Sequence, residues 1–317
     1  MSDHSIHCPA CHGTAFTPLE EVDVAVQHQN YAPKDPAMRE RLTTEAAKSS
    51  PRYQLVRCDA CLLEFCDPFV APNSQWYNLA YQTLDLYPTK RWEFEFVLDQ
   101  LTPKDRLFEI GCGSGSFLKK CVGKGIPSRG ADFAQVAVDE CRKAGLDVSH
   151  LGVADTIKTE QNGAANTVTA FQVLEHLDQP DQLFRQASQV SGPGATLWVA
   201  IPSHRRPSRQ LNQWDFLDQP PHHMTRWTDL ALNAIGERNG WAVQKVHYEP
   251  IDDKTSIWWI TTRSIPYRVL KALGLTKIGI VEKVARGVLY PLALISRIDV
   301  HQNMTGFTMM AEYRKKS

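Results

Sequence analysis

The chain has 317 residues, and its 35 Lys and Arg balance its 35 Asp and Glu. That length allows one large α/β domain with a small module, or two modest domains. The zero formal charge disfavours nucleic-acid binding, which usually leaves a basic footprint, although a local basic patch stays compatible with it. The first residues contain no apolar run, so we expect no signal peptide, a cytoplasmic setting and eight reduced cysteines.

Two Cys-x-x-Cys pairs open the chain, Cys8 with Cys11 and Cys58 with Cys61. Each pair can form a tight turn that points two thiolates inward, and two such turns make a tetrahedral site that suits Zn²⁺. Four thiolates leave no open position, so we expect a structural zinc ion. Two unrelated redox or buried pairs are the alternative. The remaining cysteines follow no pairing pattern and are interpreted as small apolar residues: Cys66, Cys112, Cys121 and Cys141.

The predicted zinc-ribbon-like module covers residues 1–70 and holds a spacer of 46 residues between its two cysteine pairs. We interpret residues 19–52 as an insertion, in which 35–48 can form an exposed helix. An aromatic segment follows over 71–103. Its aromatic residues are expected to pack as a helical connector on the next domain.

From residue 104 to the end, apolar strand patterns alternate with helix patterns, which is typical of an α/β doubly wound sheet. Another apolar segment, 264–298, precedes the last strand and carries six Lys or Arg. The expected strands are 106–110, 128–133, 148–153, 165–173, 194–201, 241–248 and 307–313. One expected helix begins at 116, and three others span 134–144, 178–190 and 228–239.

The first strand runs directly into three alternating glycines, Gly111, Gly113 and Gly115, and then into a helix. Glycines there let the backbone approach a ligand, and the helix start adds unpaired N–H groups. A dinucleotide fingerprint requires a glycine where this chain has Ser116. Glu109, two residues before the loop, would repel a pyrophosphate but suits a ligand that carries an ammonium group.

This loop resembles motif I of the class I S-adenosylmethionine-dependent methyltransferases. The resemblance implies a Rossmann-like, mostly parallel seven-stranded sheet. It also implies that Glu109, Gly111, Cys112, Gly113 and Gly115 bind the cofactor.

Further cofactor contacts are expected beyond the loop. Asp132, at the end of the second strand with Phe133 beside it, could bind the ribose hydroxyls or cap the next helix. Asp155 could meet the adenine or be a solvated loop residue. Tyr81, with Tyr87, is a candidate for a lid that zinc-ribbon methyltransferases carry at this place.

The stretch 171–177, Phe-Gln-Val-Leu-Glu-His-Leu, resembles a motif of a small-molecule methyltransferase subgroup that includes quinone-biosynthesis O-methyltransferases and sugar methyltransferases. The resemblance places Gln172 along the cofactor, while Glu175 and His176 either face the substrate or order the next helix. The same subgroup has the Pro-Pro-His-His segment that here delivers His222 and His223. Either imidazole could take a proton from a hydroxyl, or both could satisfy loop backbone groups.

We therefore expect a small-molecule O-methyltransferase with S-adenosylmethionine, a structural Zn²⁺ and a histidine base, His223 before His176. C-methylation of a sugar or polyketide-like precursor is the alternative. An NAD-dependent oxidoreductase and a non-catalytic zinc-ribbon binding protein are the rival classes. A second metal site of Glu175 with the histidines lacks a diagnostic spacing, and 264–298 is either core packing, a substrate cover or a membrane-surface patch.

Overall fold

The computed structural model describes residues 6–83, 90–153, 155, 164–210, 215–251 and 304–316. The chain divides into two compact units, and the first comprises 1–202, 215–247 and 310–317. The second comprises 203–214 and 248–309, in which the Arg205 guanidinium lies 4.5 Å from the centre of the Tyr248 ring. All site residues discussed below belong to the first unit. The domain boundaries expected from the sequence stay predictions.

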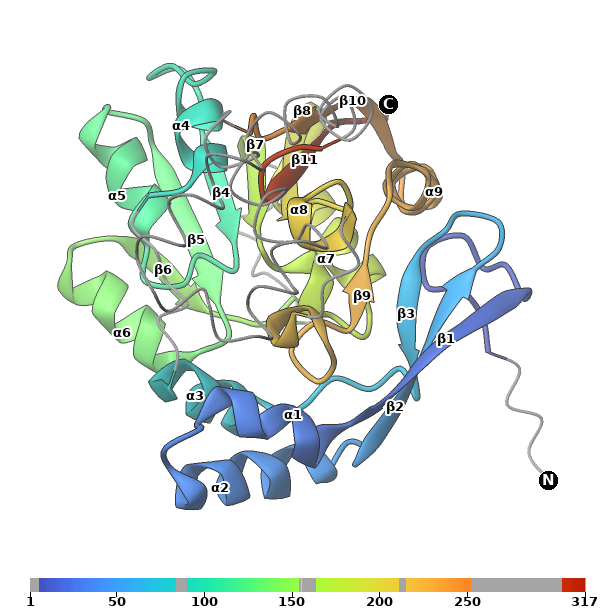
Figure 1. Ribbon diagram of the computed structural model, residues 1–317. Helices are drawn as coiled ribbons and strands as arrows, with labels where there is room; N and C mark the ends of the chain where they lie inside the picture. Colours follow the sequence, from blue (N-terminus) through green and yellow to red (C-terminus); the bar gives the residue numbers. More distant parts are fainter. Residues whose placement is uncertain are drawn as a thin grey trace, which may run out of the picture. The chain divides into compact units, whose positions relative to one another are not determined.

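A seven-stranded sheet with the order β10-β11-β8-β7-β4-β5-β6 forms the centre of the first unit (Figure 1). The neighbouring strands from β6 to β8 pair in parallel, and all four residues of β4 are buried, as expected for a sheet covered on both faces. This architecture confirms the predicted Rossmann-like α/β fold. The strands are β4 (Leu107–Ile110), β5 (Ser128–Asp132), β6 (Asp147–His150), β7 (Ala165–Phe171), β8 (Ser191–Pro202), β10 (Trp241–Tyr248) and β11 (Thr308–Lys315).

Several element boundaries differ from the sequence prediction, among them those of the third strand and of the helix before β8. The third strand, expected over 148–153, is β6 and ends at His150, where the chain turns and the Leu151 N–H donates to the Asp132 carbonyl at 2.9 Å. The helix expected from 178 is α7 and begins at Asp181, because Pro180 disfavours the helical conformation for the residue before it. The Asp178 carboxylate instead accepts the Ala71 N–H at 2.9 Å.

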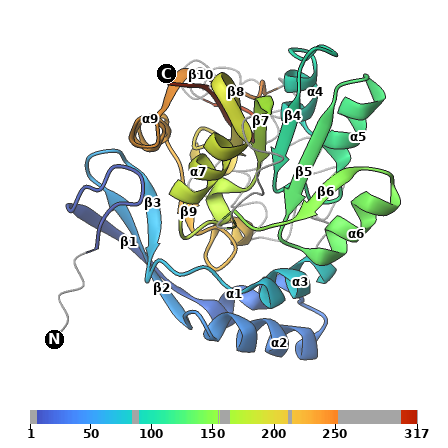
Figure 2. The same ribbon diagram turned by 180° about the vertical axis from the view of Figure 1, so that it is seen from behind.

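Helices follow the strands as the alternation predicts. In both views α5 (Ser116–Gly123) and α6 (Gln135–Lys143) lie beside β5 and β6 (Figures 1 and 2). The Thr228 hydroxyl accepts the Ala231 N–H and so caps α9 (Asp229–Arg238). Because β4, β5 and β7 run in parallel, their carboxyl ends meet at one edge of the sheet, where open α/β folds bind ligands.

The N-terminal module is a second, antiparallel sheet with the order β1-β2-β3-β9. Strands β1 (Phe16–Asp23), β2 (Arg52–Cys58) and β3 (Glu64–Asp67) come from the module itself. The fourth strand, β9 (Thr225–Arg226), comes from the later domain and lies next to β3 (Figure 1). The module is therefore joined by strand pairing to a segment of the later domain.

Helices α1 (Val24–Tyr31) and α2 (Pro36–Ala47) fill the predicted insertion, and α3 (Ser74–Thr83) packs with them. The expected helix over 35–48 is confirmed, but it is not fully exposed, because Leu42 and Ala46 are completely buried. Trp76 of α3 and Phe94 of α4 (Trp92–Leu98) are also buried, in agreement with a packed aromatic connector.

The segment 264–298, expected to be core packing, a substrate cover or a membrane-surface patch, lies outside the described residues. Among the helices of the described residues, none is both long enough and apolar enough to cross a bilayer.

A fully buried histidine in this module predicts an acid-sensitive stability. The His28 Nε2 atom accepts the Trp76 indole N–H at 3.0 Å, and its Nδ1 atom lies 3.0 Å from the Thr43 hydroxyl oxygen. That hydroxyl donates to the Arg39 carbonyl, so Nδ1 carries the proton and the ring is neutral. Burial lowers the pKa of His28 to about 4.

The His28 ring becomes protonated near pH 6.5 in the unfolded chain but only near pH 4 in the folded chain. The stability that the neutral ring contributes is therefore complete above pH 6.5 and is lost as the pH falls towards 4. We expect the free energy of unfolding at pH 5 to be about 2 kcal/mol lower than at pH 7 through His28 alone. Urea unfolding of wild type and His28→Gln at both pH values measures it. An equal pH dependence in the two proteins would contradict the assignment.

Candidate active site

The glycine loop between β4 and α5 adopts a backbone that strongly favours glycine. Gly111, Gly113 and Gly115 have φ angles of +68°, +51° and +71°. A Cβ on Gly111 would lie 2.5 Å from a Val173 methyl carbon, and one on Gly115 would lie 2.5 Å from a Leu146 methyl carbon. Side chains therefore pack closely against the loop where the Cβ atoms of larger residues would lie. On its opposite side the loop presents backbone without side chains.

Two buried carboxylates flank this loop. The Asp132 oxygens accept the backbone N–H groups of Gly113 and Ala134, each at 2.8 Å. Asp132 therefore holds the loop and does not cap α6, whose N-cap position is Ala134. Each carboxylate oxygen can accept a second hydrogen bond, so the ribose role stays a prediction.

Glu109 is 2% exposed, and its Oε2 atom has no hydrogen-bond partner among the described residues. Burial raises the pKa of Glu109 well above its usual range. A buried carboxyl oxygen without a partner fits a ligand that brings a positive charge or a donor. The loop and Glu109 together fit the aminoacyl end of S-adenosylmethionine better than a pyrophosphate.

A cavity of about 490 Å³ opens at this edge of the sheet, within the size range of small-molecule sites. It brings together most of the residues expected from the sequence, although Gly115 and Asp155 are not in its lining. The predicted residues that line it are Glu109, Gly111, Cys112, Gly113, Asp132, Phe133, Gln172, Glu175, His176, His222 and His223.

Three of the predicted cofactor residues differ from one another in their placement. Gln172 lies in the cavity wall with a φ of +56°, and its side-chain amide donates to Glu93 at 3.1 Å. Asp155 is exposed and accepts the Gly152 N–H at 2.7 Å, as a turn residue does. Tyr81 lies on α3, and Tyr87 lies outside the described residues. Their cofactor roles stay predictions.

The sequence analysis missed Tyr77, although it named the segment. This residue lies on α3, lines the cavity, and has its ring 5.8 Å from Phe133 and 5.9 Å from His176. The signal was present in the helical spacing, because Tyr77 and Tyr81 are four residues apart. Arg91 in the lining was also missed, and no motif marked it.

Three imidazoles gather at the other end of the cavity. The rings of His176, His222 and His223 have centroids 4.8–4.9 Å apart in every pairing. His176 belongs to the 3₁₀ turn η2 (Leu174–His176), and the other two follow η3 (Phe216–Asp218). The structure therefore confirms that the two histidine motifs meet, although their chemical roles stay predictions.

Hydrogen bonds define how two of these rings present their second nitrogen. The His176 Nδ1 atom donates to the His222 carbonyl at 2.7 Å, and the His223 Nδ1 atom lies 3.3 Å from an Asp218 oxygen. Both Nε2 atoms are then unprotonated acceptors in the neutral rings. Burial lowers the pKa of His176 to about 3 and that of His222 well below its usual range, so both rings are neutral at pH 7.

Glu175 lies beside the cluster and is 1% exposed, with neither carboxyl oxygen hydrogen-bonded among the described residues. Burial raises the pKa of Glu175 to about 8. The side chain is thus protonated at neutral pH and is a poorer base there than a neutral imidazole. The three imidazoles, with ligand atoms within 4.8 Å of one another, could instead hold a cation, but this grouping does not include Glu175.

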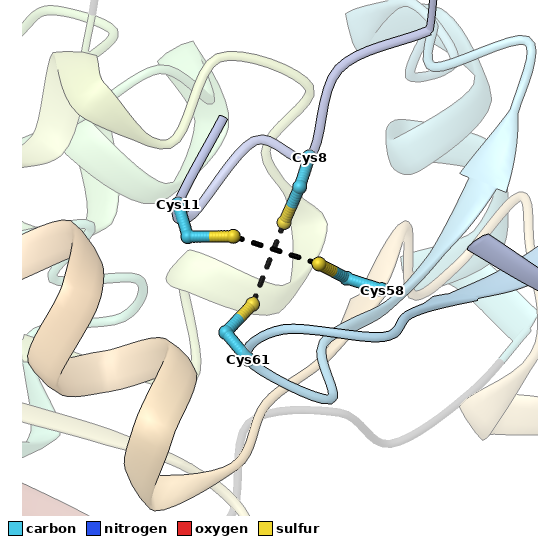
Figure 3. A group of neighbouring side chains, drawn as sticks. All are labelled: Cys8, Cys11, Cys58 and Cys61. Atoms are coloured by element: carbon cyan, nitrogen blue, oxygen red, sulfur yellow. Dashed lines mark hydrogen bonds between the residues drawn. The ribbon is translucent and has the colours of Figure 1, made fainter. Parts of the chain in front are cut away.

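The four N-terminal cysteines converge, as the sequence predicted (Figure 3). Cys8 and Cys61 have their sulfur atoms 3.5 Å apart, and so do Cys11 and Cys58. A tetrahedral zinc with bonds of about 2.3 Å would place its sulfur atoms roughly 3.8 Å apart. This donor set therefore fits a structural Zn²⁺, and a bound ion stays a prediction.

The two cysteine turns repeat one backbone pattern. The His12 N–H donates to the Cys8 carbonyl at 2.9 Å, and the Leu62 N–H donates to the Cys58 carbonyl at 2.9 Å. His12 and Leu62 both have a φ of +61°, an uncommon angle for residues other than glycine. The repetition indicates two equivalent cysteine turns of one cluster rather than two unrelated cysteine pairs.

Comparison with known proteins agrees with this site. Residues 89–246 match a family model described as a methyltransferase domain. They form a methyltransferase domain of the class I S-adenosylmethionine-dependent family, to which the chain belongs.

Two curated relatives are ubiquinone biosynthesis O-methyltransferases. The protein from Xanthomonas axonopodis pv. citri is 24% identical over 140 residues, and the one from Methylococcus capsulatus is 26% identical over 140 residues. Each match covers 42% of this chain and 59% of the relative, so the chain spans less than two thirds of their length. A solved S-adenosylmethionine-dependent methyltransferase from Archaeoglobus fulgidus is 18% identical, with a TM-score of 0.46 over 70% of this chain and 94% of its own.

Loss of the Asp132 carboxylate should weaken binding of S-adenosylhomocysteine. Asp132→Ala removes a predicted ribose acceptor and releases the Gly113 N–H from its partner. We expect a loss of roughly 1–3 kcal/mol of binding free energy by calorimetry, the range for hydrogen bonds to a charged group. Asp139→Ala, which removes an exposed carboxylate from α6, is the matched control. Unchanged affinity in Asp132→Ala would remove Asp132 from the cofactor site.

Proposed function

We propose that the protein transfers a methyl group from S-adenosylmethionine to a hydroxyl of a small-molecule acceptor. The observation that carries the proposal is that one cavity contains both the glycine loop with its buried carboxylates and the three imidazoles. The bound cofactor supplies an electrophilic methyl group, so the chain has to position the acceptor and remove a proton.

His223 is the first candidate for the base in this proposal. A hydroxyl becomes a better nucleophile when a neutral imidazole accepts its proton. The Asp218 carboxylate holds the Nδ1–H of His223, which directs the unprotonated Nε2 atom away from Asp218 and stabilises the imidazolium once it forms. His176, whose Nδ1–H is held by a carbonyl without a negative charge, is the second candidate.

The acceptor is proposed as a compact, partly apolar molecule. Tyr77, Phe94, Phe133 and Phe171 line the cavity, and aromatic rings bind flat apolar groups well. The curated relatives named for ubiquinone biosynthesis support oxygen over carbon as the methylated atom only loosely. A sugar or polyketide-like C-methylation is the alternative outcome.

Incubation with methyl-labelled S-adenosylmethionine and a panel of phenols, enols and sugars tests this function. The proposal predicts formation of S-adenosylhomocysteine together with a labelled product whose new methyl is on oxygen by NMR. A label on carbon would replace O-methylation by the alternative. The absence of both transfer and cofactor binding would contradict the proposed function.

A further inference from the structure

The strand that follows the two histidines is an edge strand of the zinc module's sheet. Glu64 of β3 pairs with Arg226 of β9, and the Cys66 N–H donates to the Met224 carbonyl at 3.2 Å. Figure 1 shows β9 beside β3, although the two strands are far apart in the sequence. The position of His223, three residues before Arg226, is therefore set in part by the N-terminal module.

A chain of buried charges runs along this junction. The Arg226 guanidinium donates through Nη1 to Glu64 at 3.0 Å, and its Nε atom lies 3.2 Å from an Asp218 carboxylate oxygen. The other Asp218 oxygen lies 3.3 Å from the His223 Nδ1 atom. Side-chain exposure is 13% for Glu64, 8% for Arg226, 6% for Asp218 and 11% for His223.

Because these charged side chains are buried, each of them depends on its partner for compensation. Each buried charge has lost hydration, and removing one partner leaves the next one uncompensated. Arg226 also donates to the Asp218 carbonyl at 2.8 Å and to the Gln219 side chain at 2.7 Å, so it fixes the backbone of the turn that carries Asp218. Glu64 supplies the opposite charge that holds this guanidinium in place.

The start of β3 is held in turn by the cysteine turns. Glu64 comes three residues after Cys61, and the Thr228 hydroxyl donates to the Cys61 carbonyl at 2.7 Å. On the other cysteine turn, Arg238 donates to the Pro9 carbonyl at 2.9 Å. Both predicted zinc knuckles thus accept a hydrogen bond from the segment that follows β9.

We infer that Glu64 is a positioning residue for methyl transfer, acting on His223 through Arg226 and Asp218. This inference rests on the proposed function, because it assigns the zinc module a role in orienting the candidate base. Glu64 does not line the cavity, and it acts by fixing the ring orientation and the protonated nitrogen of His223.

The test compares Glu64→Gln with Glu20→Gln. Glu20 also faces Arg226, 3.6 Å from its Nη2 atom, but its side chain is 45% exposed, so it is a matched control on the same guanidinium. We expect Glu64→Gln to lower kcat by about 10- to 100-fold, the scale of a small misplacement of a reacting group. The KM for S-adenosylmethionine and the zinc content should stay at wild-type values.

Two more readouts separate positioning from a general structural effect. ¹⁵N NMR of histidine-labelled protein, with His223 assigned through His223→Gln, should show the protonated Nδ1 of His223 in wild type and its loss or averaging in Glu64→Gln. The double variant Glu64→Gln/Asp218→Asn should be no slower than Asp218→Asn, because both changes act through one path.

Wild-type kcat and wild-type His223 signals in Glu64→Gln would overturn the inference, as would an equal loss of kcat in Glu20→Gln. If Glu64→Gln loses its zinc, Arg226→Lys is tested in place of Glu64→Gln, because lysine keeps the positive charge but lacks the planar fork of the guanidinium. Wild-type kcat in that variant would then overturn the inference. The NMR signals need no methyl transfer, so failure of the proposed function and failure of this inference are distinguishable.

Discussion

Replacing His223 by alanine should lower the turnover of methyl transfer by roughly 10²–10⁴-fold, the usual contribution of a general base. The affinity for S-adenosylhomocysteine should change little, because the ring lies in the histidine cluster and the cofactor loop is built from β4, β5 and their connections. Single-turnover kinetics with labelled cofactor, together with calorimetry, measure the two quantities separately.

His176→Ala is the internal comparison for this prediction. A larger loss in that variant would move the base to η2, where the imidazole is held by the His222 carbonyl. Near wild-type turnover in both single variants and in the double variant would exclude a histidine base. Activity that a chelator abolishes and a divalent cation restores, while the cysteine site keeps its zinc, would assign the imidazoles to metal binding.

The second large effect is expected at the cysteine site. Cys58→Ser should reduce the zinc content from about one ion per chain to nearly none, because a neutral hydroxyl is a poor substitute for a thiolate. Structural zinc contributes on the order of 10 kcal/mol to folding in small zinc modules, so the N-terminal sheet should lose its stability. Elemental analysis and thermal unfolding measure the two effects.

The consequences should differ between the two halves of the site. The glycine loop is held by Asp132 and by strand pairing within the seven-stranded sheet, so S-adenosylhomocysteine should still bind to Cys58→Ser. The histidine segment continues into β9, which pairs with β3 of the N-terminal sheet, so turnover should fall in this variant. Cys121→Ser, at a buried cysteine outside the cluster, is the control that should keep its zinc. A metal-free wild type prepared without chelator would contradict the zinc site.

Features that depend on local sequence could be predicted. The glycine loop, the helix after it and the two cysteine turns each require particular residues within a few positions, since a positive φ or a thiolate pair leaves little choice. The alternation of strands and helices was equally local, because buried parallel strands are apolar throughout. Errors in element boundaries arose where a single residue determines where an element begins, as Pro180 does before α7.

Features that depend on distant pairing could not be predicted. Nothing near Thr225 marks it as a strand, because β9 has two residues and exists through its pairing with β3. For the same reason the path from Glu64 to His223 was invisible in the sequence, where the two residues stand 159 positions apart. The contact between the Asp132 carboxylate and the Gly113 N–H was also hidden, since the sequence indicated only a ribose ligand or a helix cap at this position.

The central claim is that the glycine loop binds S-adenosylmethionine, and calorimetric titration of the purified chain with S-adenosylhomocysteine tests it most directly, with NAD⁺ as the competing ligand. We predict saturable binding of about one S-adenosylhomocysteine per chain, weakened in Asp132→Ala, and no measurable heat with NAD⁺. Binding of NAD⁺ without binding of S-adenosylhomocysteine would contradict the account and return the loop to the dinucleotide class.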